Sequence, residues 1–323
     1  MDNLDTISHL ASIEGYKLKI HTDINYVNHK LPYFKLTKNN DGFYDLGIYN
    51  YKSHDNADRM VFLTNYLQDN VLRLVDKGLN LTGYYNVELH DTYSYLDNGY
   101  DYSNCLVWSK NKKDHYPILM PDLYHLIDFG GKLKERDTLS WENKKDYISF
   151  YGSTTGNKNP IMNTRIKTCL WARNHNHFTN FRITNIVQMD KNVVYKNIPE
   201  INNVLSSPVH HTKLFDYKFL LDIPGNTCSW DRVPLVLNSN SLLFKMPCDD
   251  MCFYYPLLHH KEHFVGVNHH NMFANFTYYK NNPLESKEIT KRANTFVQNF
   301  LKPQHALMYL VYLFEQAGYL RGK

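Results

Sequence analysis

The chain has 323 residues, about twice the usual length of one domain, so two domains are expected rather than one small binding module. Hydrophobic residues make up 43% of the sequence and charged residues 21%, a balance that excludes a disordered or collagen-like chain. The net charge is +4 and the Lys and Arg residues are scattered, so the sequence shows no footprint for nucleic acid or a membrane surface.

Targeting signals and cysteines bear on the compartment. Residues 1–19 lack the apolar core of a signal peptide. The apolar stretch at residues 306–314 is far shorter than the roughly 20 residues that cross a bilayer. Five cysteines, an odd number in a long chain, do not fit a disulfide framework. These features predict a cytoplasmic protein without an integral membrane segment, and they leave its oligomeric state open.

The first part of the chain contains one predicted helix and two predicted strands. Apolar residues at helical spacing favour a long amphipathic helix over residues 55–77, with Gly78 as its C-cap. Strand-like runs follow at residues 84–89 and 105–109. Asp91 comes just after the first of these runs, which places an acid at the end of a strand.

A second pattern begins after residue 145. Residues 147–151 predict a strand, residues 152–159 a loop, and residues 160–173 a helix with Pro160 at its first position. The order then returns as a strand, a loop, a short helix and a strand, over residues 218–223, 224–229, 230–238 and 241–245. This alternation is typical of a parallel α/β sheet. Two further helices are predicted, one with an apolar face from Ile289 to Phe300 and one from Pro303 to about Gly318.

Both loops of this pattern contain small residues and precede an arginine. Ligands of open α/β sheets bind at the carboxyl ends of the strands, and N–H groups at the start of a helix attract phosphate. One such loop alone also fits an ordinary turn. Two of them, each followed by an arginine, predict a site for a nucleotide diphosphate. The residues of this predicted site are Gly152, Ser153, Thr155, Arg165, Gly225, Asn226, Ser229 and Arg232.

At these loops the sequence resembles glycosyltransferase family 90, which includes protein O-glucosyl- and O-xylosyltransferases and enzymes of capsule and lipopolysaccharide synthesis. The resemblance covers residues 84–313. It is carried by residues 148–156 with Arg165, and by residues 216–222 leading into the loop before Arg232. Further segments match in the expected order, at residues 85–91, 118–122, 238–245, 253–257 and 263–267.

The resemblance implies a GT-B fold, in which two Rossmann-like domains face each other across a cleft. The implied divisions are residues 1–140 on the acceptor side, residues 141–302 for the nucleotide sugar, and a C-terminal helix, residues 303–323, that packs back on the first domain. The implied reaction is inverting and metal-independent transfer from a UDP-sugar, glucose or xylose being usual, to a hydroxyl of a glycan or protein. In agreement, the sequence has no Asp-X-Asp triplet to hold a cation, so no cofactor is expected.

Direct displacement at a sugar needs a base for the acceptor hydroxyl and positive charge for the departing diphosphate. The resemblance implies Asp91 as the base. Arg165 and Arg232, with the N–H groups after Gly152 and Gly225, are the expected leaving-group stabilisers. Without the resemblance, a turn- or helix-capping carboxylate is the alternative for Asp91.

Other hypotheses stay open beside this one. Asp122 and Trp108 are candidate acceptor-side residues. A non-catalytic protein of the same fold would bind a sugar or nucleotide without turnover. A zinc site is a third possibility because thiolate and imidazole are preferred zinc ligands, and they gather at Cys248, Cys252, His259, His260 and His263. The His pair at residues 210–211 is interpreted as part of a loop or the surface.

Overall fold

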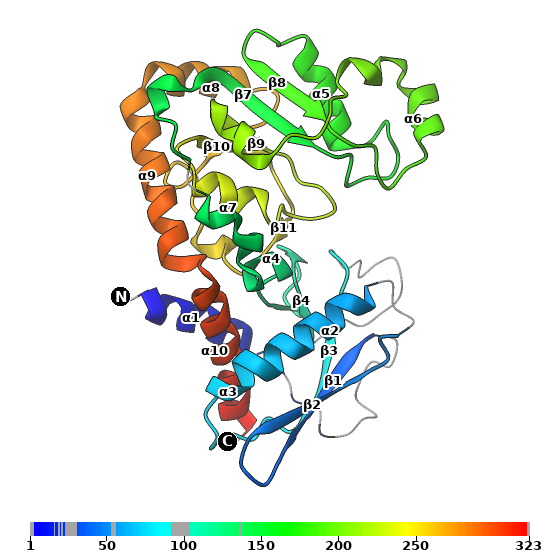
Figure 1. Ribbon diagram of the computed structural model, residues 1–323, viewed down its shortest axis with the longest axis vertical. Coiled ribbons are helices and arrows are strands. Elements are labelled where there is room, and N and C mark those ends of the chain that lie inside the picture. The colour runs from blue at the N-terminus through cyan, green and yellow to red at the C-terminus, as the bar shows by residue number, and fades with distance from the viewer. Residues whose placement is uncertain are drawn as a thin grey trace. The chain divides into compact units, whose positions relative to one another are not determined.

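The computed structural model describes residues 3–15, 17–18, 20, 22, 31–52, 56–91, 104–135 and 137–321 (Figure 1). Contacts between residues divide the chain into two compact units. The first unit comprises Met1–Gly130, Asp249–Tyr255 and Asn299–Lys323, and the second comprises Gly131–Cys248 and Pro256–Gln298. The C-terminal helix therefore belongs to the same unit as the N-terminal part of the chain.

The first unit contains a five-stranded mixed sheet in the order β2-β1-β3-β4-β6. β1 is antiparallel to both β2 and β3, whereas β3, β4 and β6 are parallel. Its helices and strands are α1 (Asn3–Gly15), β1 (Tyr33–Lys38), β2 (Tyr44–Tyr49), α2 (Ala57–Tyr66), the π-helical turn η2 (Leu67–Val71), α3 (Leu72–Leu74), β3 (Gly83–Val87), β4 (Cys105–Val107), β5 (Lys110–Asn111), β6 (Ile118–Leu119), α4 (Leu123–Leu126), β11 (Asp250–Met251) and α10 (Pro303–Arg321).

An antiparallel hairpin makes this sheet differ from the all-parallel sheet of a Rossmann-like domain. In the turn between β1 and β2, the Oδ1 atom of Asn39 accepts hydrogen bonds from the N–H groups of Asp41 and Phe43, at 3.1 and 3.0 Å. Gly42 has a φ of +82°, a conformation that a residue without a Cβ adopts readily. The turn chemistry of these residues therefore builds a hairpin where a parallel unit would need a crossover.

The helix predicted at residues 55–77 is present but shorter. It forms α2, η2 and α3 and ends at Leu74, because Val75 takes an extended conformation with ψ of 140°. Gly78 has no left-handed φ, so its prediction as the C-cap is wrong. None of the helices in the described parts of the chain is long and apolar enough to span a membrane.

Buried contacts fasten the two terminal helices of the first unit. α1 packs along α10, and the Phe314 ring of α10 lies 5.6 Å from the ring of Tyr85 on β3. Glu14, near the end of α1, accepts hydrogen bonds from Lys110 Nζ at 2.9 and 3.0 Å and from the N–H of Leu119 at 2.9 Å. Burial lowers the pKa of Lys110, and the Glu14 carboxylate opposes that shift.

The second unit contains a five-stranded sheet in the order β12-β10-β9-β7-β8, and every pair in it is parallel. Its elements are η4 (Trp141–Asn143), β7 (Lys145–Gly152), α5 (Thr164–Arg173), β8 (Thr179–Ile183), α6 (Lys191–Asn197), η5 (Pro199–Asn203), η6 (His211–Asp216), β9 (Tyr217–Asp222), α7 (Arg232–Leu237), β10 (Leu242–Lys245), β12 (Val265–Gly266), α8 (Met272–Asn281) and α9 (Pro283–Phe300). The turns η3 (Asp128–Lys134) and η7 (Tyr255–Leu257) lie where the chain passes between units. The predicted parallel α/β sheet is confirmed.

The start of α5 differs from the sequence prediction. The helix begins at Thr164 rather than at Pro160, and Asn163 is its N-cap, with Oδ1 accepting a hydrogen bond from the N–H of Ile166 at 3.1 Å. The Nδ2 group of Asn163 also donates to the carbonyl oxygen of Thr154 at 2.8 Å. A residue that caps the helix and ties the preceding loop fixes the helix start more strongly than a proline three residues earlier.

Candidate functional site

The two predicted loops leave the same edge of the second unit's sheet. β7 and β9 are parallel neighbours, and loops 153–163 and 223–231 follow their carboxyl ends. The next strand after β7 lies on one side of it and β9 lies on the other, so the strand order reverses between β7 and β9. Such a reversal is where open parallel sheets bind ligands. The sequence motifs therefore occupy the position that the topology favours for a site.

Arg165, on α5, ties the two loops together. Its Nη1 donates to the carbonyl oxygen of Ser153 at 3.1 Å and to Oγ1 of Thr155 at 2.5 Å, both in the first loop. Its Nε and Nη2 donate to the carbonyl oxygen of Ile223, at the start of the second loop, at 3.2 and 3.0 Å. The side chain is buried. These contacts make Arg165 first of all a residue that positions the loops.

The loops approach each other so closely that glycine is required. A Cβ on Gly225 would lie 2.6 Å from Thr155 Oγ1, too close for any side chain. Gly156 has a φ of +117°, and its N–H donates to Oδ1 of Asn226 at 2.9 Å. A Cβ on Gly152 would lie 2.7 Å from the Phe150 ring. Gly225 and Gly156 thus let the two loops meet, and Gly152 leaves room for the Phe150 ring of its own strand.

Two backbone N–H groups of the loops have partners within the protein. The N–H of Thr154 donates to the carbonyl oxygen of Asn185 at 3.0 Å, and the N–H of Gly225 donates to that of Thr227 at 3.1 Å. These two groups stabilise the loops themselves.

Arg232 brings a second guanidinium to the same place. It is the first residue of α7, and its Nη2 donates to the carbonyl oxygen of Tyr151 at 2.6 Å. The guanidinium carbons of Arg232 and Arg165 lie 4.7 and 5.8 Å from the centroid of one Phe150 ring. Burial, followed by the charge of Arg232, lowers the pKa of Arg165 to about 10. The charges of Asp222 and Asp231 oppose that lowering. Two guanidinium groups beside one ring form a candidate site for an anion.

A buried ion pair holds the start of the second loop. Asp222 ends β9 and is fully buried; its Oδ2 lies 2.9 Å from Nζ of Lys245, the residue opposite it on β10. Its Oδ1 accepts a 2.6 Å hydrogen bond from Ser229. Burial alone would raise the pKa of Asp222, but Lys245 and Ser229 together hold it below its usual value. Ser229, predicted to bind the donor, is therefore engaged in holding its own loop.

Sequence reasoning did not select Asp222 or Lys245 as site residues. The available signal was an acid at the end of one buried strand run and a lysine at the end of the next. Pairing them requires the strand register, which places Asp222 opposite Lys245.

Asp91 belongs to the first unit and follows β3. Its Oδ1 lies 2.9 Å from Nη1 of Arg59, which also donates to the carbonyl oxygen of Leu89 at 2.8 Å. Ser109 Oγ donates to the carbonyl oxygen of Asp91 at 2.8 Å. The side chain is 33% exposed. Residues 92–103, where a helix capped by Asp91 would begin, lie outside the described part of the chain, and the capping alternative stays a prediction.

The two acceptor-side candidates have structural surroundings. Asp122 is fully buried and is the N-cap of α4, accepting from the N–H groups of Tyr124 and His125 at 2.9 and 3.4 Å. Its Oδ2 also lies 3.0 Å from Nδ1 of His125. Trp108 is 1% exposed, which leaves no ring face open for stacking on a sugar.

The structure does not assemble the zinc site suggested by Cys248, Cys252 and the nearby histidines. His260 Nδ1 accepts from the N–H of Gly266 at 2.9 Å, and His263 Nδ1 accepts from that of His259 at 3.1 Å. Among the described residues, the group whose ligand atoms come within reach of one ion is a different one, Glu135, His210 and His211. The cysteines and histidines of residues 248–263 are near one another in sequence, but the structure does not bring three of their ligand atoms within reach of one ion.

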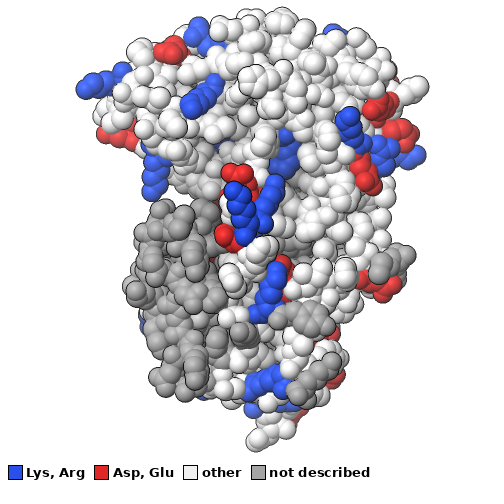
Figure 2. All heavy atoms as spheres, turned by 180° about the vertical axis from the view of Figure 1, so that it is seen from behind, with Lys and Arg blue, Asp and Glu red and all other residues white. Residues whose placement is uncertain are grey.

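Charge is mixed on the face that Figure 2 shows. Lys and Arg side chains stand among Asp and Glu side chains there, and the described residues of this face form no wide area of one sign.

Comparisons with known proteins identify the family. Residues 129–321, more than half of the chain, match the model of glycosyl transferase family 90. The chain therefore belongs to glycosyltransferase family 90, and the family inferred from its motifs is confirmed. The match includes both loops, Arg165 and Arg232, whereas Asp91, Trp108 and Asp122 precede it.

Other comparisons find only distant similarity. No curated protein matches the chain significantly. One solved structure similar to it is a glycosyltransferase from Rickettsia africae ESF-5, with 10% sequence identity and a TM-score of 0.37. The similar region covers 69% of this chain and 65% of that one. The chain thus matches less than two thirds of the length of that structure.

Proposed function

We propose that this chain transfers a sugar, glucose or xylose, from a UDP-sugar to a hydroxyl of a glycan or protein, with inversion and without a divalent cation. Family membership supports glycosyl transfer as the reaction. The observation that carries the proposal is the pair of guanidinium groups of Arg165 and Arg232, 5.8 and 4.7 Å from the Phe150 ring, where the strand order reverses. A diphosphate supplies the negative charge that this pair favours. The odd number of cysteines supports a cytoplasmic setting.

In the proposed in-line displacement, one residue acts as the base, one stabilises the leaving group and one positions the loops. Asp91 is the proposed base: it takes the proton of the acceptor hydroxyl, and the acceptor oxygen then attacks the anomeric carbon. The bond between that carbon and the diphosphate oxygen breaks, UDP leaves, and the configuration inverts. Arg232 stabilises the negative charge on the departing diphosphate. Arg165, with four hydrogen-bond contacts to the two loops, keeps the loops in place.

A nucleotide-sugar screen tests the proposal directly. UDP-glucose or UDP-xylose is expected to raise the melting temperature, because a ligand that binds only the folded state stabilises it by mass action. Release of UDP is then expected when an acceptor with free hydroxyls is added. Binding without release would support the non-catalytic alternative. A melting temperature that no nucleotide sugar raises would overturn the proposal.

Replacing Arg232 with Ala should weaken UDP binding by about 10- to 150-fold and leave uridine binding nearly unchanged, because a charge-assisted phosphate contact contributes about 1.5–3 kcal/mol. Titration calorimetry with both ligands measures the difference. Arg173→Ala is the matched control, since this exposed arginine ends α5 and lies outside the loops. Equal losses for UDP and uridine would instead assign Arg232 a structural role. The parallel Arg165→Ala variant should lower the melting temperature as well, because it removes the tie between the loops.

Donor binding and transfer should persist in EDTA, because protein cations take the place of a metal on the diphosphate. The measurement is the initial rate of UDP release with and without chelator, well below the melting temperature. Loss of transfer in EDTA, with recovery on adding Mg²⁺ or Mn²⁺, would show that the diphosphate needs a cation.

A further inference from the structure

A second group of chemically active side chains lies at the opposite edge of the second unit's sheet. His210 and His211 are at the start of η6, which leads into the amino end of β9. The proposed donor loops follow the carboxyl end of the same strand. Six residues of strand separate the two ends, a length of roughly 20 Å. The group is therefore separate from the diphosphate site.

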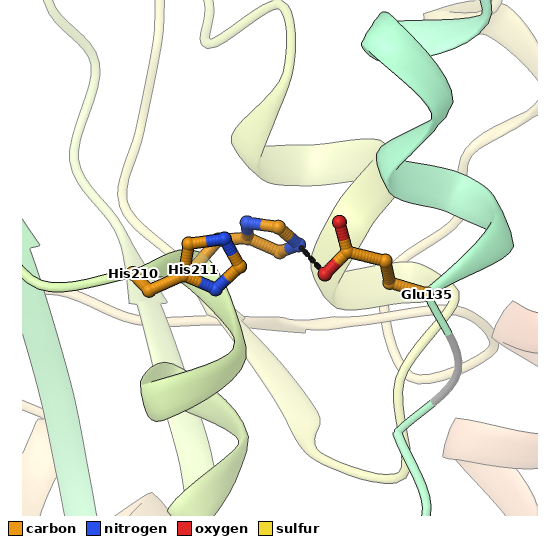
Figure 3. Close-up of side chains that lie close together, drawn as sticks. All are labelled: Glu135, His210 and His211. Carbon is orange, nitrogen blue, oxygen red and sulfur yellow. Dashed lines mark ion pairs between the residues drawn. The ribbon is translucent and has the colours of Figure 1, made fainter.

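The three side chains converge (Figure 3). Glu135 follows η3, and the ligand atoms of Glu135, His210 and His211 all lie within 4.8 Å of one another. His211 Nε2 is 3.1 Å from Glu135 Oε2, and the two imidazole rings are 4.3 Å apart. Nε2 of His211 is shielded from solvent and faces the Glu135 carboxylate. A carboxylate oxygen and a ring nitrogen thus already lie side by side, as two ligands of one ion would.

The donor set and its spacing suit zinc. Two imidazoles and one carboxylate form a common three-ligand set, completed by water in a tetrahedral arrangement. Bonds of about 2.0–2.2 Å place neighbouring tetrahedral ligand atoms about 3.3–3.5 Å apart, so the 3.1 Å pair needs little movement. Glu135 and His210 are exposed, which leaves them free to turn toward an ion.

Contacts of neighbouring residues orient His210 and hold the segment that carries Glu135. His210 Nδ1 is 2.9 Å from Oγ1 of Thr212, a partner that leaves Nε2 as the ligand atom. Close to Glu135 in sequence, Asp137 lies 2.7 Å from Nζ of the buried Lys144, which also donates to the carbonyl oxygen of Phe215. This ion pair already ties the segment after Glu135 to η6. The backbone next to Glu135 is thus connected to η6, the turn that begins at His211.

We propose that Glu135, His210 and His211 bind one divalent transition-metal ion, zinc in the first place, at the amino edge of this sheet. The ion fastens the segment after η3 to η6, and it plays no part in donor binding. The zinc content of the protein, and the effect of a chelator on its melting temperature, are therefore independent of whether sugar transfer needs a metal.

Zinc binding to the whole chain without a polyhistidine tag tests the proposal. The wild type is dialysed against Zn²⁺ and then against buffer, and its bound zinc is measured by atomic emission. One equivalent per chain is expected. Zn²⁺ should also raise the melting temperature, and Co²⁺ in its place should give the visible absorption of a tetrahedral site.

Variants separate this site from the other histidines of the chain. Glu135→Gln and His211→Ala should each weaken zinc binding by about tenfold or more and abolish the rise in melting temperature. Glu135→Gln changes an exposed side chain and keeps the fold testable should His211→Ala fail to fold. His270→Ala, which removes an exposed histidine of the same unit, should behave as wild type. Zinc retained in full by Glu135→Gln and by His211→Ala, or no stoichiometric zinc in the wild type, overturns the proposal.

Discussion

Replacing Asp91 with Asn should lower the rate of sugar transfer by roughly 10²–10⁴-fold, while donor affinity and melting temperature stay near those of the wild type. Asn keeps the size of the side chain and an oxygen that accepts the hydrogen bond from Arg59, which lies 2.9 Å from Oδ1 of Asp91. It cannot take a proton from the acceptor hydroxyl at neutral pH. The transfer rate and the unfolding free energy should be measured on one preparation.

The control for this variant is a second acid of the same unit that pairs with an arginine. Asp69 lies 3.5 Å from Arg73 on the surface, and Asp69→Asn should change neither transfer nor stability measurably. If Asp91 serves only the local structure, the result reverses: stability falls by about 1 kcal/mol and turnover per folded molecule is unchanged. Near-wild-type transfer by a well-folded Asp91→Asn variant would direct the search to Glu88 or Asp122.

The order of elements in the second unit could be predicted because its physical signals are local. Buried strands such as β9 and β10 are short apolar runs, and glycine, proline or polar residues interrupt the chain after each of them. The start of α5 could not be predicted from Pro160. Asn163 fixes it through a contact with Thr154, nine residues earlier, and such contacts leave no periodic trace.

In the first unit, by contrast, the sequence contains a hairpin signal that the sequence analysis did not use. Asp41-Gly42 between two runs of alternating residues is typical of a hairpin, and a hairpin is what the structure contains. The prediction of a Rossmann-like sheet in this part came from the family resemblance and carried no local support. A short turn sequence was here a better guide to strand direction than the resemblance.

At the site, the sequence located the residues but not their partners. Gly225 and Arg165 were selected for phosphate, yet both serve to join the two loops: Arg165 donates to the carbonyl oxygen of Ile223, and Gly225 lies against Thr155. Sequence reasoning missed these partners because a backbone carbonyl such as that of Ile223 carries no mark in a sequence. The metal-ligand group was missed for a similar reason. Glu135 is distant along the chain from His210 and His211, and only the fold brings the carboxylate to the imidazoles.

Replacing Lys245 with Met should lower the free energy of unfolding by about 3–5 kcal/mol, because it leaves the carboxylate of Asp222 buried without its cation. Asp222 is fully buried and Lys245 is 7% exposed, so solvent screens this pair little. Urea unfolding at pH 7 measures the loss. Lys145→Met is the matched control: Lys145 lies 3.8 Å from Asp216, both are partly exposed, and a change within about 0.5 kcal/mol is expected.

The pH dependence of stability distinguishes the loss of this ion pair from a simple packing defect. In the wild type the pKa of Asp222 is held below its usual value, so its contribution to stability is present above the unfolded-state pKa of about 4 and is lost as the pH falls through the folded-state pKa. Without Lys245, burial dominates and raises that pKa, which reverses the sign: protonation now favours the folded state. The Lys245→Met variant should therefore recover part of its lost stability between pH 7 and pH 5, where the wild type gains nothing from Asp222. A deficit that is equal at both pH values would mean that the lysine matters for its aliphatic packing, and Asp222 would then owe its low pKa to Ser229 and Arg232.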